Sequence, residues 1–409
     1  MSSLAPMPRL SLSDEIASLQ LSAVAQINAS VKANPRPDII SLTGGEPDIA
    51  PLPGIFDRIG RVQRSYKYSP IDGYPELREL LLQKLNGRNE IVGQDLAVLC
   101  CSGGCGGLFL SFRSILNDAD EVLIPDPCWE YMPTLIQLAG GRVRRFRVMS
   151  HAGHWEVDLD SLSRAVTTRT RAVLINTPLN PVGLVHTRAA LTGIAQICAQ
   201  NGLWIVSDEV TETFVYGSAR HVSVASLYPH TLTVHSFSKT YGLTGLRFGY
   251  LSGPRSAIEQ AKKVQLYTTM YPSSVAQEVA MRVLEQPHED FLREVKTTFE
   301  KKSAHFAAGL RSLPGVEIAD PDGGLFVFPK VTAEISGAEL QKSLLEQQGL
   351  AVAPGSAFGT GTATNLRMFV GAPYEIIDEA VARLGRFLNN PVSAQASSKS
   401  TRPVVRTQE

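Results

Sequence analysis

The chain has 409 residues, of which 44% are hydrophobic and 19% are charged, as in globular proteins of enzyme size. Lysine plus arginine and aspartate plus glutamate both number 39, which argues against nucleic acid or an anionic membrane as the main partner. The five cysteines are too few for a disulfide scaffold and lack zinc-site spacing, so we expect reduced thiols, a cytoplasmic protein and no bound metal.

The N-terminal part of the chain predicts a tail, a helix and a short strand. Residues 1–12 read as a tail, residues 14–31 as an amphipathic helix and residues 39–42 as a strand. The strand is followed by Thr43-Gly44-Gly45, where two glycines mark a turn at which the backbone approaches another group closely.

The central part of the chain alternates short apolar runs with helical stretches. This pattern is typical of an α/β fold with a mostly parallel sheet and helices on both of its faces. The uncharged run at residues 96–112 is interrupted by glycines and is too short to span a membrane. Seven strands are expected, at 96–101, 121–124, 143–148, 171–176, 203–207, 231–235 and 246–252.

The last third of the chain predicts a smaller α+β domain. Apolar residues at helical spacing between Phe291 and Leu313 indicate a long helix, which strands near 316–319, 325–328 and 366–370 and a helix at 375–388 follow. The expected domains are an N-terminal arm that is part of the small domain (1–50), a large domain (51–290), the small domain itself (291–390) and a disordered tail (391–409).

Residues with useful chemistry follow several of the expected strands. The glycine-rich segment Ser102–Gly107 follows the first strand, and it fits a phosphate cradle and tight packing equally well. Trp129 follows the second strand and can stack on a flat ring, although a core tryptophan is commoner. Asn180 sits in a proline-containing turn that can aim its amide into a pocket.

Two further strand ends carry an acid and an amine. Asp208 ends a buried apolar strand, where a carboxylate is costly unless a cation meets it. Lys239 follows the next strand and can form a Schiff base, while Arg247 can hold a phosphate through two hydrogen bonds. Together, these strand ends suit a flat pyridine that carries a phosphate and an aldehyde.

This ordered set of motifs, between about residues 39 and 388, resembles the fold type I, class I/II aminotransferases of the aspartate aminotransferase superfamily. The resemblance implies pyridoxal 5′-phosphate (PLP) as cofactor, Lys239 as the catalytic Schiff-base lysine and Asp208 as the partner of the ring nitrogen. It also implies further cofactor contacts from Gly104, Cys105, Trp129, Asn180, Thr211, Ser236, Ser238 and Arg247, and from Tyr68 of the other subunit of a homodimer with shared active sites. Substrate contacts are implied for Gly45, Asn180 and Arg367, and cis peptide bonds for Asp126-Pro127 and Asn180-Pro181.

The expected reaction moves the amino group of an α-amino acid to a 2-oxo acid, with Lys239 as general base. Residues 256–281 contain no arginine, whereas relatives that act on dicarboxylates place a second arginine there, so we expect a substrate with a neutral or basic side chain. Thr211 stands where most relatives have tyrosine, and family members with altered ring contacts run other reactions. A PLP-dependent lyase, cyclase or oxidase of secondary metabolism is therefore the alternative. A PLP-binding regulatory module is disfavoured because only about 12 residues precede the first expected helix.

Overall fold

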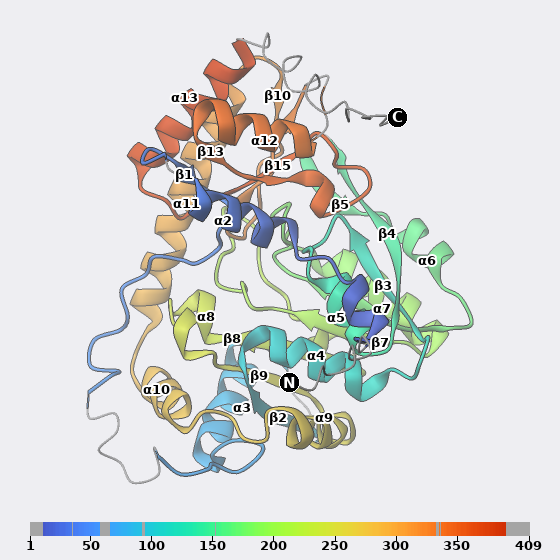
Figure 1. The fold of residues 1–409 in the computed structure, drawn as a ribbon. Helices are drawn as coiled ribbons and strands as arrows, with labels where there is room; N and C mark the ends of the chain where they lie inside the picture. The colour runs from blue at the N-terminus through green and yellow to red at the C-terminus, as the bar shows by residue number, and fades with distance from the viewer. Residues whose placement is uncertain are drawn as a thin grey trace, which may run out of the picture.

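A computed structural model describes residues 11–34, 36–57, 66–91, 95–151, 153–332, 335 and 337–389. An eight-stranded sheet in the order β2-β9-β8-β7-β6-β3-β4-β5 forms the centre of the larger part of the molecule (Figure 1). In chain order its strands are β2 (Leu96–Cys101), β3 (Glu121–Asp126), β4 (Arg142–His151), β5 (His154–Val157), β6 (Thr170–Asn176), β7 (Trp204–Asp208), β8 (Thr231–Ser236) and β9 (Gly249–Pro254).

The predicted mostly parallel sheet is confirmed, with two antiparallel strands and one more strand than expected. β9 runs antiparallel between β2 and β8, and β5 runs antiparallel at the edge, beside β4. β5 is missing from the sequence prediction because His151 and His154 read as loop residues, whereas they face each other across the β4–β5 hairpin. β9 also begins three residues later than predicted, because Arg247 has a left-handed backbone with φ of 52° and ends the preceding turn.

Helices cover both faces of this sheet because successive strand residues point to opposite sides. In β3, Val122 and Ile124 pack with α4, α5 and α9, whereas Leu123 packs on the other face with α6 and α7. α3 and α10 extend the second layer at the β2 edge. These helices are α3 (Pro75–Asn89), α4 (Gly103–Ile115), α5 (Met132–Leu138), α6 (Leu159–Ala165), α7 (Arg188–Asn201), α9 (Arg255–Thr268) and α10 (Ser274–Glu285). The short α8 (Phe237–Thr240) follows β8 directly.

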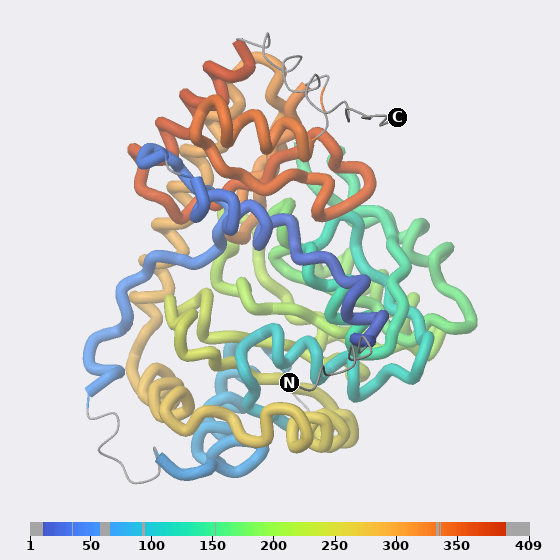
Figure 2. Tube along the Cα trace, in the orientation of Figure 1, coloured from blue at the N-terminus to red at the C-terminus, as the bar shows by residue number. Residues whose placement is uncertain are grey.

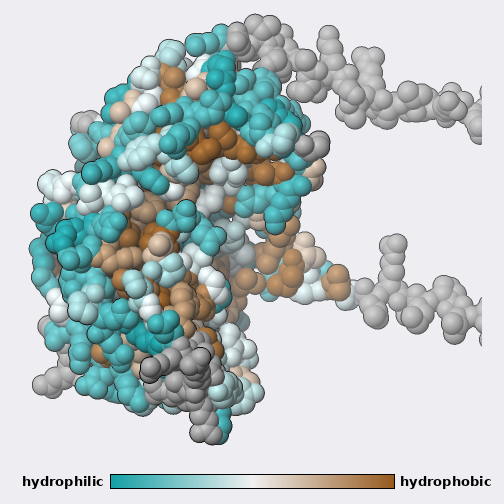
Figure 3. Space-filling view, turned by 90° about the vertical axis from the view of Figure 1, so that its left-hand side faces the viewer, coloured by the Kyte–Doolittle hydropathy of each residue, from teal (hydrophilic) through white to brown (hydrophobic). Residues whose placement is uncertain are grey.

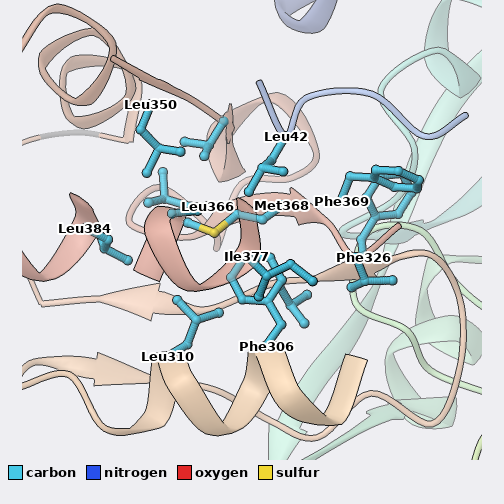
Figure 4. Close-up of a cluster of buried hydrophobic side chains, with 14 of the residues drawn as sticks. Leu42, Phe306, Leu310, Phe326, Leu350, Leu366, Met368, Phe369, Ile377 and Leu384 are labelled. Atoms are coloured by element: carbon cyan, nitrogen blue, oxygen red, sulfur yellow. The ribbon is translucent and has the colours of Figure 1, made fainter. Parts of the chain in front are cut away.

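The smaller part of the molecule is built from the C-terminal third and the strand β1 (Ile40–Ser41). β1 pairs with β13 (Leu350–Ala351), and Leu42 joins a core with Leu350, Leu366 and Phe369 (Figure 4). The remaining strands are β10 (Val316–Glu317), β11 (Phe326–Val327), β12 (Lys330–Val331), β14 (Ala353–Pro354) and β15 (Leu366–Phe369). Its helices are α11 (Glu289–Arg311), α12 (Gly337–Gln348) and α13 (Tyr374–Asn389). The predicted α+β architecture from both chain ends is therefore confirmed.

The predicted single helix at 14–31 is wrong in one respect, because it is broken into α1 (Asp14–Ser18) and α2 (Ala23–Ala33). Ser22 caps α2 by accepting the Ala25 N–H at 3.1 Å, and a capping serine starts a new helix rather than continuing one. In Figures 1 and 2 this segment runs across the front of the molecule, between the small sheets and the large one.

In the described part of the chain, no helix combines the length and the apolar character needed to cross a bilayer. The domain boundaries at residues 50, 290 and 390 stay a prediction. Of the expected tails at 1–12 and 391–409, residues 1–10 and 391–409 lie outside the described residues.

Candidate active site

A cavity of about 460 Å³ lies at the carboxyl ends of β6 and β7, and the small part of the molecule closes it through β11 and β15. This is the edge at which parallel α/β sheets place their ligands. Eight residues predicted from the sequence line it: Gly45, Cys105, Trp129, Asn180, Asp208, Thr211, Lys239 and Arg367. Residues more than 300 positions apart are thereby brought to one site.

Asp208 is the last residue of β7, and 3% of its surface is exposed. One carboxylate oxygen accepts the Val210 N–H at 3.2 Å, and the Asp208 carbonyl accepts the amide of Asn176 at 3.1 Å. The pKa of Asp208 is raised to about 7, chiefly by burial and also by the neighbouring Glu209, while the Val210 N–H and Lys239 oppose the rise. A cation beside such a buried carboxyl group would stabilise its ionised form.

A buried ion network holds the segment behind Asp208. The Glu212 carboxylate accepts hydrogen bonds from Lys84 at 2.7 Å and Asn89 at 2.6 Å, and Glu209 lies 3.2 Å from the His221 ring. Glu209 also accepts the hydroxyl of Ser223 at 2.7 Å. Although two carboxylates and a histidine meet here as in some metal sites, their oxygens already have donors and a lysine supplies the positive charge. We therefore interpret this cluster as a structural ion network.

The Lys239 amine reaches into the cavity from α8 and donates to the Gly45 carbonyl at 2.7 Å. Burial lowers its pKa, and the positive charges of Arg247 and Arg367 add to this effect, whereas Glu46 and Cys105 oppose it. A lysine with a lowered pKa is a better nucleophile and proton acceptor near neutral pH than a solvated one.

Beside the cavity, four more of the predicted residues form a group around the first turn of α4. A side chain on Gly103 would meet the Arg247 guanidinium at 2.9 Å, so this arginine lies against the glycine backbone. A side chain on Gly104 would meet Val210 at 2.9 Å and Ser236 at 3.8 Å. The Ser238 hydroxyl is buried here without a hydrogen-bond partner. Because the first N–H groups of a helix also lack partners, this group suits an anion such as a phosphate.

Arg367 brings a buried cation from β15 to the opposite side of the cavity. Its Nη2 donates to the Thr43 carbonyl at 2.8 Å and its Nη1 to the Asn180 side-chain oxygen at 3.2 Å. The guanidinium lies 4.1 Å from the ring centre of Phe326 and 4.7 Å from that of Phe358, while its Nε has no partner. Burial lowers the pKa of Arg367 to about 10. A negative group at this position would restore the lost solvation of the cation.

Trp129 and Thr211 line the cavity as expected, whereas Tyr68, which was expected to reach the site of the other subunit, lies outside the cavity of its own chain. The Trp129 ring lies 4.8 Å from that of Tyr131, and the Thr211 hydroxyl donates to the Pro178 carbonyl at 3.5 Å. Tyr68 lies on the surface with 83% of its area exposed, 4.7 Å from the Tyr271 ring. Within one chain, Tyr68 is therefore separate from the other predicted residues.

Sequence reasoning missed several residues that complete the cavity. Phe326 and Leu325 come from the small part of the molecule, Val24 from α2 and Tyr131 from the turn before α5. The Gly44-Gly45 turn indicated that the backbone near Thr43 approaches another group. No sequence pattern indicated that Val24 lies at the cavity. The predicted cis bonds at Asp126-Pro127 and Asn180-Pro181 are confirmed, and Thr177-Pro178 is a third.

The chain is similar in sequence and structure to known proteins. Residues 37–384 match the family model described as "Aminotransferase class I and II". The chain is 32% identical to an aspartate aminotransferase of Geobacillus stearothermophilus over 93% of this chain and 99% of that protein. It is 34% identical to a probable aspartate/prephenate aminotransferase of Aquifex aeolicus, over 86% and 91% of the two chains. The crystal structure of an aromatic aminotransferase from Pyrococcus horikoshii superposes with a TM-score of 0.83 at 30% identity, covering 90% of this chain and 99% of that one.

The raised pKa of Asp208 predicts a change in stability with pH for the ligand-free protein. Between the ordinary aspartate pKa of 3.8 and about 7, the folded state holds a proton that the unfolded state has lost, so burying Asp208 destabilises the fold as pH rises. From pH 4 to pH 8, Asp208→Asn should therefore gain up to about 4 kcal/mol of unfolding free energy relative to the unmodified chain. Urea unfolding at several pH values measures this difference.

The exposed Asp160, replaced by asparagine, is the matched control and should leave the pH dependence unchanged. If Asp208→Asn changed stability equally at pH 4 and pH 8, the Asp208 carboxyl group would not have a raised pKa.

Proposed function

Since the chain belongs to the class I and II aminotransferases, which act with PLP, we propose that it moves the amino group of a neutral or basic α-amino acid to a 2-oxo acid. The observation that carries the proposal is that a buried acid, a buried amine with a lowered pKa and a buried arginine face one cavity. Each of these groups has a separate task in the proposed reaction.

The residues beside the cavity fit the phosphate of this cofactor. Gly104 and Cys105 lie in the first turn of α4, and the unpartnered Ser238 hydroxyl, Ser236 and the Arg247 guanidinium surround the same place. Arginine presents several N–H groups in a plane that matches a phosphate, which strengthens the fit. Cys105 can contribute its backbone N–H, so a thiol in place of a hydroxyl does not weaken the cradle.

Asp208 would pair with the protonated ring nitrogen of the cofactor, and Trp129 would stack on the ring. When bound, PLP supplies an aldehyde that joins the substrate amine and a ring that withdraws electrons from the α-carbon. Asp208 fits this role because a cation facing it would offset its desolvation and keep it ionised. Asn180 and Thr211 would contact the ring oxygen, with threonine supplying a shorter donor than the tyrosine of most relatives.

Lys239 would hold the cofactor and then act as the general base. As a free amine it would take the α-proton of the substrate and deliver it to the cofactor carbon that carried the aldehyde. Its lowered pKa supports this role, because an amine that is protonated at neutral pH cannot accept a proton. Gly45, whose carbonyl accepts a hydrogen bond from the lysine, would line the substrate side of the site.

Arg367 would bind the α-carboxylate of the substrate. Its guanidinium is buried, is fixed by Thr43 and Asn180 and still carries an unpartnered Nε. Such a cation favours an anionic ligand, and a planar carboxylate matches its geometry. Because Asn180 also contacts Arg367, cofactor and substrate would be held by one connected set of residues.

The side-chain preference is supported by the lining of the cavity. Among the described residues that line it, Lys239 and Arg367 are the two cations, and both have other tasks. The rest of the wall includes Val24, Leu179 and Phe326. Lys262 and Lys263 lie on α9 and contact Asp72 and Gln260 instead. A second carboxylate in the substrate would therefore lack a cationic partner among the described residues that line the cavity.

The cofactor assignment predicts which lysine is modified. After borohydride reduction of the yellow holoenzyme, PLP should be bound covalently to Lys239, and Lys239→Ala should retain none after denaturation. Peptide mass spectrometry locates the adduct, and the exposed Lys263→Ala is the control that should keep full labelling. An adduct on a different lysine would contradict the assignment.

The substrate assignment predicts the order of turnover in a panel of amino acids. Leucine, phenylalanine or arginine should be used with a kcat/KM at least about tenfold above that of aspartate, because aspartate would leave a desolvated carboxylate unpaired. The panel is measured with and without a 2-oxo acid acceptor. A higher value for aspartate than for every neutral or basic amino acid would refute the assignment, and product formed without an acceptor would favour a lyase, cyclase or oxidase. The relatives compared above are named as aminotransferases, which favours transamination.

We also propose a homodimer in which Tyr68 reaches the phosphate site of the other subunit. Tyr68 and Tyr267 are 83% and 86% exposed, and Tyr66 and Met270 are exposed as well. Figure 3 shows an apolar segment that projects from the body of the molecule, and Leu12, Ile16 and Leu21 are exposed, which also supports an interface. Large exposed apolar residues of this kind mark protein–protein contacts.

Dimerisation predicts that sedimentation velocity at micromolar concentration yields twice the chain mass, and that Tyr267→Asp shifts the protein towards the monomer. Tyr374→Asp, at an exposed tyrosine on α13, should not. Because the sites would be shared, mixing Tyr68→Ala with Lys239→Ala should give more activity than either variant alone. A monomer with full activity would contradict this proposal.

A reducing compartment such as the cytoplasm is the proposed location, since all five cysteines carry free thiols. Recovery of the native protein outside the cell would contradict it.

A further inference from the structure

We propose that Glu130 is a positioning residue that holds the first turn of α2 over the cavity, so that Val24 forms one wall of the pocket for the substrate side chain. Val24 is then a specificity-determining residue. This inference rests on the aminotransferase function proposed above for the pocket itself, but the contacts that carry it involve only residues of this chain.

The Glu130 carboxylate binds the start of α2 through two hydrogen bonds. It accepts the Ala23 N–H at 3.1 Å and the Val24 N–H at 3.4 Å, and the Ser22 hydroxyl donates to the Tyr131 hydroxyl at 3.0 Å. These N–H groups belong to the first turn of the helix, where no intrahelical acceptor exists and where a negative charge is stabilising. Glu130 and Tyr131 directly follow Trp129, so the contact anchors α2 to the wall of the cavity.

A second contact ties α2 to Arg367. The Asn28 side chain accepts the Thr43 hydroxyl at 2.7 Å, and the Thr43 carbonyl accepts Arg367 Nη2 at 2.8 Å. The charge of Arg367 also counteracts the rise that burial causes in the pKa of Glu130. Both contacts of α2, one through Glu130 and one through Thr43, therefore lie close to the arginine that would bind the substrate carboxylate.

These polar contacts matter because α2 buries few apolar side chains. Ile27 is its one buried residue, packed against Leu345 and Ala351, and α1 before it has none. An isolated helix of 11 residues is marginal in water, so its position depends on tertiary contacts. Val24 is half-buried and lines the cavity, which means that loosening α2 would widen the pocket.

Hydrogen–deuterium exchange of the holoenzyme tests the anchor without relying on turnover. Glu130→Gln should speed exchange of the amides of residues 23–26 by about tenfold, because the charged acceptor is lost. Asp158→Asn is the matched control, since Asp158 caps α6 by accepting the Ser161 N–H at 2.8 Å, away from the cavity, and it should not change exchange in α2. If Glu130→Gln does not fold, Glu130→Asp should show a smaller increase. Unchanged exchange in α2 would overturn the proposal.

Substrate selectivity tests whether Val24 forms a wall of the pocket for the substrate side chain. Val24→Ala should raise the ratio of kcat/KM for phenylalanine over alanine at least about fivefold. Glu130→Gln should move the ratio in the same direction, mainly through KM, whereas Asp158→Asn should keep it within about twofold. A ratio unchanged in Val24→Ala would overturn the role of Val24. If no amino acid were transaminated at all, the proposed function would fail, while the exchange measurement would still decide on the anchor.

Discussion

The buried carboxylate of Asp208 is the constraint on which the active-site edge of the sheet depends. Desolvation raises its pKa to about 7, and one backbone N–H, from Val210, offsets only part of the cost of its charge. The nearby Lys84 amine and His221 ring are engaged by Glu212 and Glu209 behind it. A cationic ring nitrogen on the cavity side would therefore offset the desolvation of the Asp208 carboxylate, which the protein groups around it offset only in part.

The second requirement is that the small part of the molecule reaches this edge. Arg367 does so from β15, and its guanidinium N–H groups meet the Thr43 carbonyl and Asn180, so one cation joins the N-terminal segment, β15 and the turn after β6. Phe326 and Phe358 shield it from water. The pairing of β1 with β13 brings the segment around Thr43 to the small part of the molecule, so that segments far apart in the sequence build one wall of the cavity.

The sequence predicted the residues at strand ends well, because the carboxyl ends of parallel strands must meet at one edge of the sheet. Asp208, Lys239 and Asn180 were found in this way, and the resemblance to a family added Arg367. Contacts that depend on long-range packing were not predictable. The Ser22 cap marks the break between α1 and α2 locally, but the start of α2 also binds Glu130, which lies 106 or more positions further along the chain, and no local pattern reveals this contact. Tyr68 was expected at the phosphate of the other subunit; it is exposed on a single chain, and this contact stays a prediction.

The central claim is that this edge of the sheet binds PLP in one orientation. A crystal structure of the protein soaked with PLP tests it most directly. The account predicts the phosphate between the first turn of α4 and Arg247, and the ring nitrogen within hydrogen-bonding distance of the Asp208 carboxylate. A ring nitrogen that faces another residue, or a cofactor bound outside the cavity, would contradict it.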